Sequence, residues 1–186
     1  MKKVIIFLVS LFLSISAFGQ NLQLQVGKDN SKIVFEADKF VNNDYFYGYA
    51  EAGADLSPYT QLIYEHSFWK GLGIHTEFRT DFNTNMYFLG PMWTFVLPKG
   101  CIMVEPLCRY EGRQFYWQGS VVASFDWKRC DLYGYIDVWG QSTPMVYSEI
   151  KWFAKVNEHL GLGTSVNFMY FGKFDCIPYL GIRYSF

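Results

Sequence analysis

The chain has three histidines, His66, His75 and His159, which are its first candidates for acid–base or metal chemistry. A nucleophilic site needs a base within hydrogen-bond reach of a hydroxyl or thiol group. His66 precedes Ser67, but adjacent residues of a strand point to opposite faces and cannot pair directly. His159 lies in a segment with turn character. Three histidines without a close cluster of other ligands also do not predict a metal site.

His75 belongs to a larger set of polar residues that share one face of their segments. His75, Glu77 and Arg79 follow one another at intervals of two residues, so all three share one face of a strand. This spacing favours a ladder of charges over a catalytic role for His75. Such residues either line a pore that mildly favours cations, or neutralise each other across strands and fill the interior. The residues predicted to line the interior are Glu36, Asp38, Glu51, Glu65, His75, Glu77, Arg79, Glu105, Arg109, Asp137, Glu149, Lys151 and Arg183.

Motifs of common enzymes are missing from residues 20–186. The sequence has no G-x-S-x-G, H-E-x-x-H or C-x-x-C motif and no Gly-rich phosphate loop. A formal net charge of -1 also gives no basic face for nucleic acid. We therefore expect no enzyme, catalytic residue, metal or cofactor, and no nucleic-acid partner.

The elements that position the polar face are predicted to be β-strands, because apolar and polar residues alternate with a period of two throughout residues 20–186. In residues 114–127, for example, Phe115, Trp117 and Val121 oppose Gln118 and Ser120. This pattern predicts an all-β, antiparallel up-and-down barrel with short turns, the largest being 53–58 and 140–144. The turn signals divide the chain into twelve strands, at 21–27, 32–41, 44–53, 58–69, 71–81, 85–97, 100–112, 114–127, 129–140, 144–156, 160–171 and 174–186.

Composition indicates which face of this barrel is inside. Alternation alone also fits a soluble lipocalin-like barrel. However, with 20% aromatic and 18% charged residues, the chain is more aromatic and less charged than an ordinary soluble domain. In lipid the strands must close on themselves, because an open edge would leave backbone groups unpaired. We therefore predict a transmembrane barrel in contact with the lipid of a Gram-negative outer membrane. Six tryptophans near predicted strand ends fit an interfacial aromatic belt: Trp69, Trp93, Trp117, Trp127, Trp139 and Trp152.

The start of the chain is predicted to be an export signal. Two lysines precede an apolar run at residues 4–13, and Ala17 and Gly19 fit a signal-peptidase site. This predicts a cleavable signal peptide at 1–19 and the outer-membrane barrel at 20–186.

The last strand ends in Phe186, with Leu180, Ile182 and Tyr184 on the same face. This ending resembles the carboxy-terminal signal of outer-membrane barrels, which implies the barrel-assembly machinery as a partner. In the same alternation three of the four cysteines fall on the lipid side, so disulfides are not expected. Those three are Cys108, Cys130 and Cys176, whereas Cys101 lies near a turn and a link from it is left open.

Two stretches carry a family resemblance: 64–78, YEHSFWKGLGIHTEF, and 85–93, NMYFLGPMW. They resemble matching segments of a family of small exported barrel proteins of unknown function, itself similar to the nucleoside-specific channel-forming protein Tsx. The resemblance implies a twelve-stranded barrel with a narrow pore for nucleosides or other small polar solutes. Because this chain is short, the resemblance assigns no substrate-binding residue.

Three functions follow as hypotheses. The first is a narrow passive channel for small polar solutes. The second is a closed structural or interaction barrel, and the third is a membrane-embedded lipid enzyme that uses His75.

Overall fold

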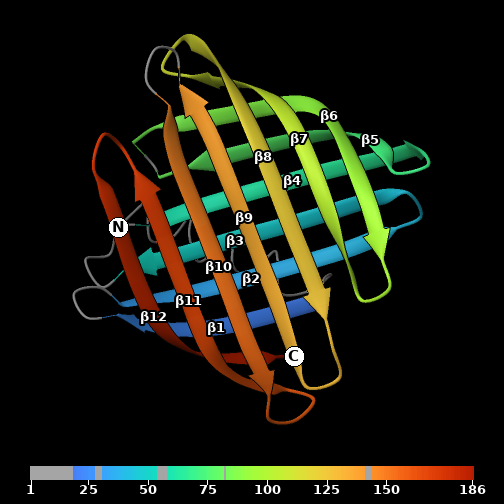
Figure 1. Ribbon diagram of the computed structural model, residues 1–186, viewed down its shortest axis with the longest axis vertical. Coiled ribbons are helices and arrows are strands. Elements are labelled where there is room, and N and C mark those ends of the chain that lie inside the picture. The colour runs from blue at the N-terminus through green and yellow to red at the C-terminus, as the bar shows by residue number, and fades with distance from the viewer. Residues whose placement is uncertain (1–18, 28–30, 54–57, 82, 141–143) are drawn as a thin grey trace.

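The computed structural model describes residues 19–27, 31–53, 58–81, 83–140 and 144–186 (Figure 1). The predicted signal peptide, apart from Gly19, and the middles of the two largest predicted turns lie outside these residues. No helix among the described residues is long and apolar enough to span a bilayer. The strands are β1 (Gly19–Gly27), β2 (Ser31–Val41), β3 (Asp44–Gly53), β4 (Pro58–Trp69), β5 (Leu72–Thr80), β6 (Asn85–Leu97), β7 (Gly100–Glu111), β8 (Gln114–Asp126), β9 (Cys130–Gly140), β10 (Met145–Lys155), β11 (Leu160–Tyr170) and β12 (Phe174–Ser185).

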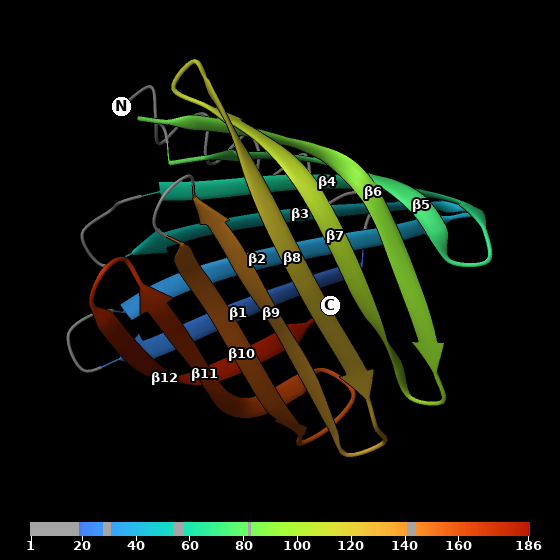
Figure 2. The ribbon, with the colours of Figure 1, turned by 45° about the horizontal axis from the view of Figure 1, so that its top comes forward.

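These twelve strands form one closed antiparallel barrel in which each strand pairs with its neighbours in sequence. The barrel closes where β1 pairs with β12, with Asn21 opposite Ser185 and Leu24 opposite Ile182. Figures 1 and 2 show β1 and β12 side by side although they lie at opposite ends of the chain. The predicted fold and all twelve predicted strands are confirmed, with every strand end within two residues of its predicted position.

The polar face points into the barrel. In β1 the apolar Leu24 and Val26 are about half exposed on the outside, whereas Gln23 and Gln25 are buried. The same division holds in β8, where Phe115 and Trp117 are exposed and Gln118 is buried. Since apolar groups in water are costly, this exterior suits acyl chains and the interior suits polar groups. The soluble, inside-out alternative is therefore wrong.

Aromatic and cysteine side chains follow the same alternation, with one correction. Five of the six tryptophans are exposed on the outside, but Trp139 lies inside the barrel under the guanidinium of Arg109, 4.8 Å from its ring. The reason is parity, because Trp139 is two residues from the inward Asp137. All four cysteines are free, and the exposed Cys108 and Cys176 confirm the lipid-side placement.

Tight turns join several hairpins. Lys70 and Gly71 both have positive φ, 42° and 84°, as in the two-residue turns that match strand twist. A Cβ built on Gly71 would lie 2.2 Å from the Thr94 carbonyl oxygen, so no larger residue fits there without movement of the backbone.

The pairing of β6 with β7 is interrupted at its centre. Backbone pairs run from Met86 to Leu89 and resume at Trp93, and the register sets Pro91 opposite Pro106 in the gap. Proline lacks an N–H donor. Two prolines at one hydrogen-bonded pair remove both of its bonds, which accounts for the interruption.

Candidate functional site in the barrel lumen

The polar residues predicted to face the interior all lie on the walls of two cavities inside the barrel. Eight of these thirteen residues are acidic and four are basic. Each is positioned by strand alternation alone, because residues two apart on a strand share a face.

The first cavity, the vestibule, has a volume of about 1130 Å³ and lies at the end of the barrel that carries the turns 42–43 and 157–159. Its wall includes Asp38 and Arg183. Arg183 makes a two-pronged contact with Asp131 of β9, at 2.8 and 2.5 Å, and its guanidinium stacks over the Phe153 ring at 4.7 Å.

The second cavity, the inner chamber, has a volume of about 420 Å³ and a wall of tyrosines and charged groups. Its size falls within the range of small-ligand pockets. A tyrosine offers both a flat ring and a hydroxyl group, so this wall can stack on a planar solute and hydrogen-bond to it. The tyrosines on its wall are Tyr45, Tyr47, Tyr49, Tyr59, Tyr133, Tyr135 and Tyr147.

The walls of both cavities share six residues, which therefore mark the level at which the two cavities meet. We call this level the constriction: Tyr45, Tyr47, Glu65, Met103, Tyr133 and Lys151. At this level the ammonium group of Lys151 lies 2.7 Å from Glu36 Oε1, which joins β10 to β2. The same ammonium lies 5.2 Å from the centre of the Tyr49 ring.

A second lysine compensates the neighbouring carboxylates. Lys32 of β2 is buried and lies 2.9 Å from Glu51 and 3.6 Å from Glu149. Lys151 also contacts Glu149, at 3.4 Å, and the Ser165 hydroxyl donates to Glu149 at 2.9 Å. Lys32 is not among the residues predicted to line the interior, although its spacing from Glu36 by an even number of residues places both on one face of the strand.

A second connection across the lumen joins β5 to β9. Arg79 Nη1 donates to Asp137 Oδ2 at 2.9 Å, and the same guanidinium donates to Glu77. The Ser120 hydroxyl donates to the other oxygen of Asp137 at 2.7 Å. Buried carboxylates are stable when paired and hydrogen-bonded in this way.

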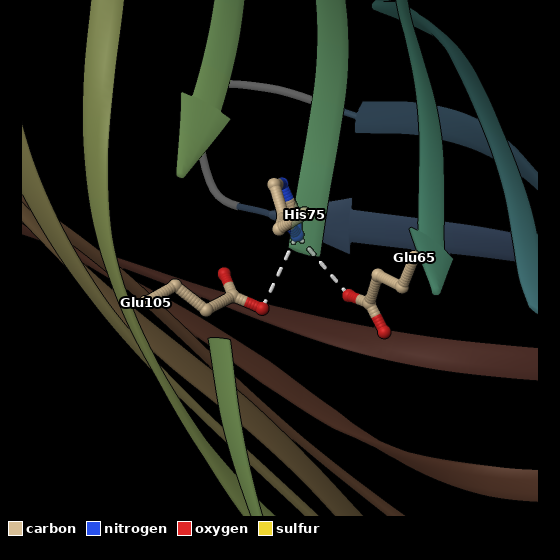
Figure 3. A group of neighbouring side chains, drawn as sticks. All are labelled: Glu65, His75 and Glu105. Carbon is tan, nitrogen blue, oxygen red and sulfur yellow. Dashed lines mark hydrogen bonds and ion pairs between the residues drawn. The ribbon is translucent and has the colours of Figure 1, made fainter. Parts of the chain in front are cut away.

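His75 lies among three carboxylates from three strands, and two of them, Glu65 and Glu105, are drawn in Figure 3. Its Nδ1 atom is 3.2 Å from Glu65 Oε1 and 3.2 Å from Glu105 Oε1, and both carboxylates point toward it. Its Nε2 atom is 3.3 Å from Glu77 Oε2. The expectation that no ligand cluster surrounds a histidine is therefore wrong, because β4, β5 and β7 bring together residues far apart in sequence.

The other two histidines do not join this group. His66 lies on the outside, with Nδ1 2.8 Å from Asp44 Oδ1, while Ser67 faces the vestibule as its parity predicts. His159 Nδ1 lies 2.9 Å from the Ser185 carbonyl oxygen. The polar contacts of the three histidines are with carboxylates or a carbonyl oxygen, and among the described residues none of them contacts a hydroxyl or thiol nucleophile.

Comparison with known proteins identifies the fold. No protein-family model and no curated protein sequence matches the chain. Among solved structures, KdgM porin matches with a TM-score of 0.61 and 12% identity, over 90% of this chain and 99% of that one. A structure of KdgM porin in complex with disordered oligogalacturonate gives 0.60 and 13%, over the same shares of the two chains. NanC porin gives 0.61 and 7%, over 91% and 99%.

The chain has the twelve-stranded barrel of small outer-membrane porins. At these identities the likeness establishes the fold alone, and the apolar exterior places this fold in the outer membrane. None of these three matches bears on the resemblance to Tsx-like proteins, which stays a prediction.

Proposed function

We propose that the protein is a narrow passive channel for small polar solutes. The observation that carries this proposal is that two cavities with charged and tyrosine side chains on their walls, the vestibule and the inner chamber, share the constriction inside one closed barrel. Wet, charged walls lower the barrier for polar solutes, and an excess of carboxylates favours cations over anions.

Nucleosides are the solute class that we propose for this channel. The tyrosines of the inner chamber supply flat rings for stacking on a base, and neighbouring groups such as Gln61 and Asn167 can hydrogen-bond to a sugar. Liposomes containing the barrel are expected to take up uridine faster than glucose, which lacks a flat aromatic ring for stacking. Equal uptake of both solutes would contradict the preference for nucleosides and indicate a general channel for small polar solutes.

The constriction gives the direct test of conduction. Tyr47→Ala and Tyr133→Ala remove rings from this passage and are expected to raise single-channel conductance in planar bilayers. Tyr87→Ala is the matched control, because Tyr87 is exposed on the outside of the barrel. A wild-type barrel that is silent, and that stays silent in both lumen variants, would contradict the channel.

A second candidate is a closed structural or interaction barrel. It is favoured by the ion pairs of Lys151 with Glu36 and of Arg79 with Asp137, which cross the lumen between strands that are not neighbours. Paired charges of this kind can fill an interior instead of lining a path. The conductance experiment decides between the two candidates.

We also propose the route by which the protein reaches the membrane. Residues 1–19 direct export and are removed, and the barrel-assembly machinery recognises the last strand through Phe186. The alternation and the exposed Phe186 side chain support the second step.

A further inference from the structure

Three lumen residues bring potential metal-ligand atoms close together, and the hydrogen bonds among them leave one carboxylate oxygen without a partner. Glu65 of β4, His75 of β5 and Glu105 of β7 each offer one atom, and these atoms lie within 4.8 Å of one another. In a four-coordinate metal site with ligands at 2.0 to 2.2 Å, neighbouring ligand atoms lie about 3.2 to 3.6 Å apart. The two distances of 3.2 Å from His75 Nδ1 fall at this spacing.

Gly90 of β6 explains how residues of β5 and β7 can meet across an intervening strand. Gly90 lies opposite His75 in the register, so it faces the lumen and carries no side chain there. A Cβ at this position would lie 2.2 Å from the Pro106 carbonyl oxygen, so the close approach of β6 and β7 requires glycine. The space beside His75 is therefore left to Glu105.

Glu105 gives a second, independent observation that points to a ligand, because one of its buried carboxylate oxygens has no hydrogen-bond partner. Its side chain is 3% exposed, and its Oε1 atom accepts no hydrogen bond even though it lies 3.2 Å from His75 Nδ1. One ring nitrogen can donate one proton, and Nδ1 is directed at Glu65. A buried carboxylate oxygen without a partner costs free energy, which a bound cation would recover.

Glu77 holds the imidazole from the opposite side. Glu77 Oε2 lies 3.3 Å from His75 Nε2 and also accepts from Arg79 Nη2 at 3.0 Å. In metal sites a carboxylate commonly accepts the second ring N–H of a ligating histidine, which fixes the tautomer. With the proton on Nε2, the lone pair of Nδ1 points toward Glu65 and Glu105.

The charges around this group also favour a divalent cation. The ion pairs described for Glu65 and Glu105 are with His75 alone, whereas the lumen lysines and arginines pair with other carboxylates. Two carboxylates and a neutral imidazole carry a charge of about −2. A cation with two positive charges balances them.

We propose that Glu65, His75 and Glu105 bind one divalent transition-metal cation, represented by Zn²⁺, inside the lumen. One imidazole nitrogen and two carboxylate oxygens suit Zn²⁺ and its first-row neighbours, whereas Ca²⁺ takes six to eight oxygen ligands. Glu65 lies on the wall of both cavities, so an ion in the vestibule can reach the group, and the inner chamber leaves room for a water as fourth ligand. The proposal of a metal site does not depend on whether the barrel conducts solutes.

The test uses the barrel purified in detergent and stripped of metal with a chelator. Calorimetric titration with Zn²⁺ is expected to give one site per barrel. His75→Ala and Glu105→Gln are expected to weaken binding at least about tenfold, and Glu77→Gln about 10- to 100-fold through the imidazole. His159→Ala and Glu149→Gln are the matched controls and should bind as the wild type does.

Spectroscopy separates this site from capture by cysteine. Co²⁺ in the same barrel is expected to give visible d–d bands that disappear in the His75→Ala variant, without sulfur-to-metal charge-transfer bands. Heat-modified migration in gels verifies that each variant is folded, and Glu105→Gln, nearly isosteric, serves where His75→Ala does not fold. Wild-type binding equal to that of folded Glu105→Gln, or bands of thiolate ligation, would overturn the proposal. A silent barrel that binds Zn²⁺ would refute the channel and leave this site standing.

Discussion

Lys151 Nζ lies 2.7 Å from Glu36 Oε1, and this ion pair joins strands β10 and β2 across the lumen. The two residues are 115 positions apart in sequence. Because Lys151 is also on the wall of both cavities, its charge lies where a permeating ion would be most strongly affected.

Replacing Lys151 with methionine is expected to make the proposed channel more cation-selective. Glu36 would then lose its ammonium partner, and Glu149 would keep only that of Lys32. A change of one charge in the constriction is expected to alter the difference between cation and anion energies by on the order of 1 kcal/mol, which is about fivefold in the permeability ratio. Glu36→Gln should shift selectivity in the opposite direction. Reversal potentials in a KCl gradient measure both shifts, and unchanged potentials in folded variants would contradict this assignment.

Leu180→Arg is expected to destabilise the barrel because Leu180, 73% exposed, lies on the outer face near the middle of β12. Arginine at the bilayer midplane costs about 2–4 kcal/mol, against about 0–1 kcal/mol near the interface. Phe174→Arg, at the first residue of the same strand, is therefore the control. Urea unfolding in lipid vesicles, followed by tryptophan fluorescence, gives both values. Equal costs at the two positions would be inconsistent with a membrane-embedded β12.

Pro106→Val is expected to stabilise the barrel. The new N–H can donate to the facing carbonyl of Pro91, and one such bond contributes about 0.5–1.5 kcal/mol. Pro178→Val is the control, because Pro178 remains paired with Val166 and interrupts no bond of the β11–β12 pairing. The free energy of unfolding in urea is the measurement. A gain at position 178 but none at 106 would show that the missing bonds are unimportant.

Removal of Phe186 is expected to lower the amount of folded barrel in the outer membrane, while the purified variant should still fold in detergent. The physical reason is that, among the aromatic contacts described, Phe186 makes one T-shaped contact, with the Tyr184 ring, so recognition is expected to depend on Phe186 more than folding does. Phe115→Ala removes an equally exposed ring from β8 and should leave the amount unchanged. Heat-modified migration of outer-membrane fractions measures both, and normal assembly without Phe186 would refute its recognition.

The sequence by itself determined the strands, their closure and their orientation. Alternation with a period of two is a local property, so it marks each strand and its two faces without knowledge of any partner. Once one face is apolar and the other polar, the cost of lipid-exposed backbone and charge leaves a closed barrel with the polar face inside. This is why the inward position of His75 and the outward position of Cys108 could both be predicted.

Only the tertiary structure decided which inward residues meet. Alternation says nothing of depth in the lumen or of contacts across it, since these depend on strand register and closure. The register brings Glu65, His75 and Glu105 together and sets Gly90 beside them, and closure brings Lys151 to Glu36. A local pattern can thus assign a side chain to the lumen, but its partner comes from strands that the chain reaches only after folding.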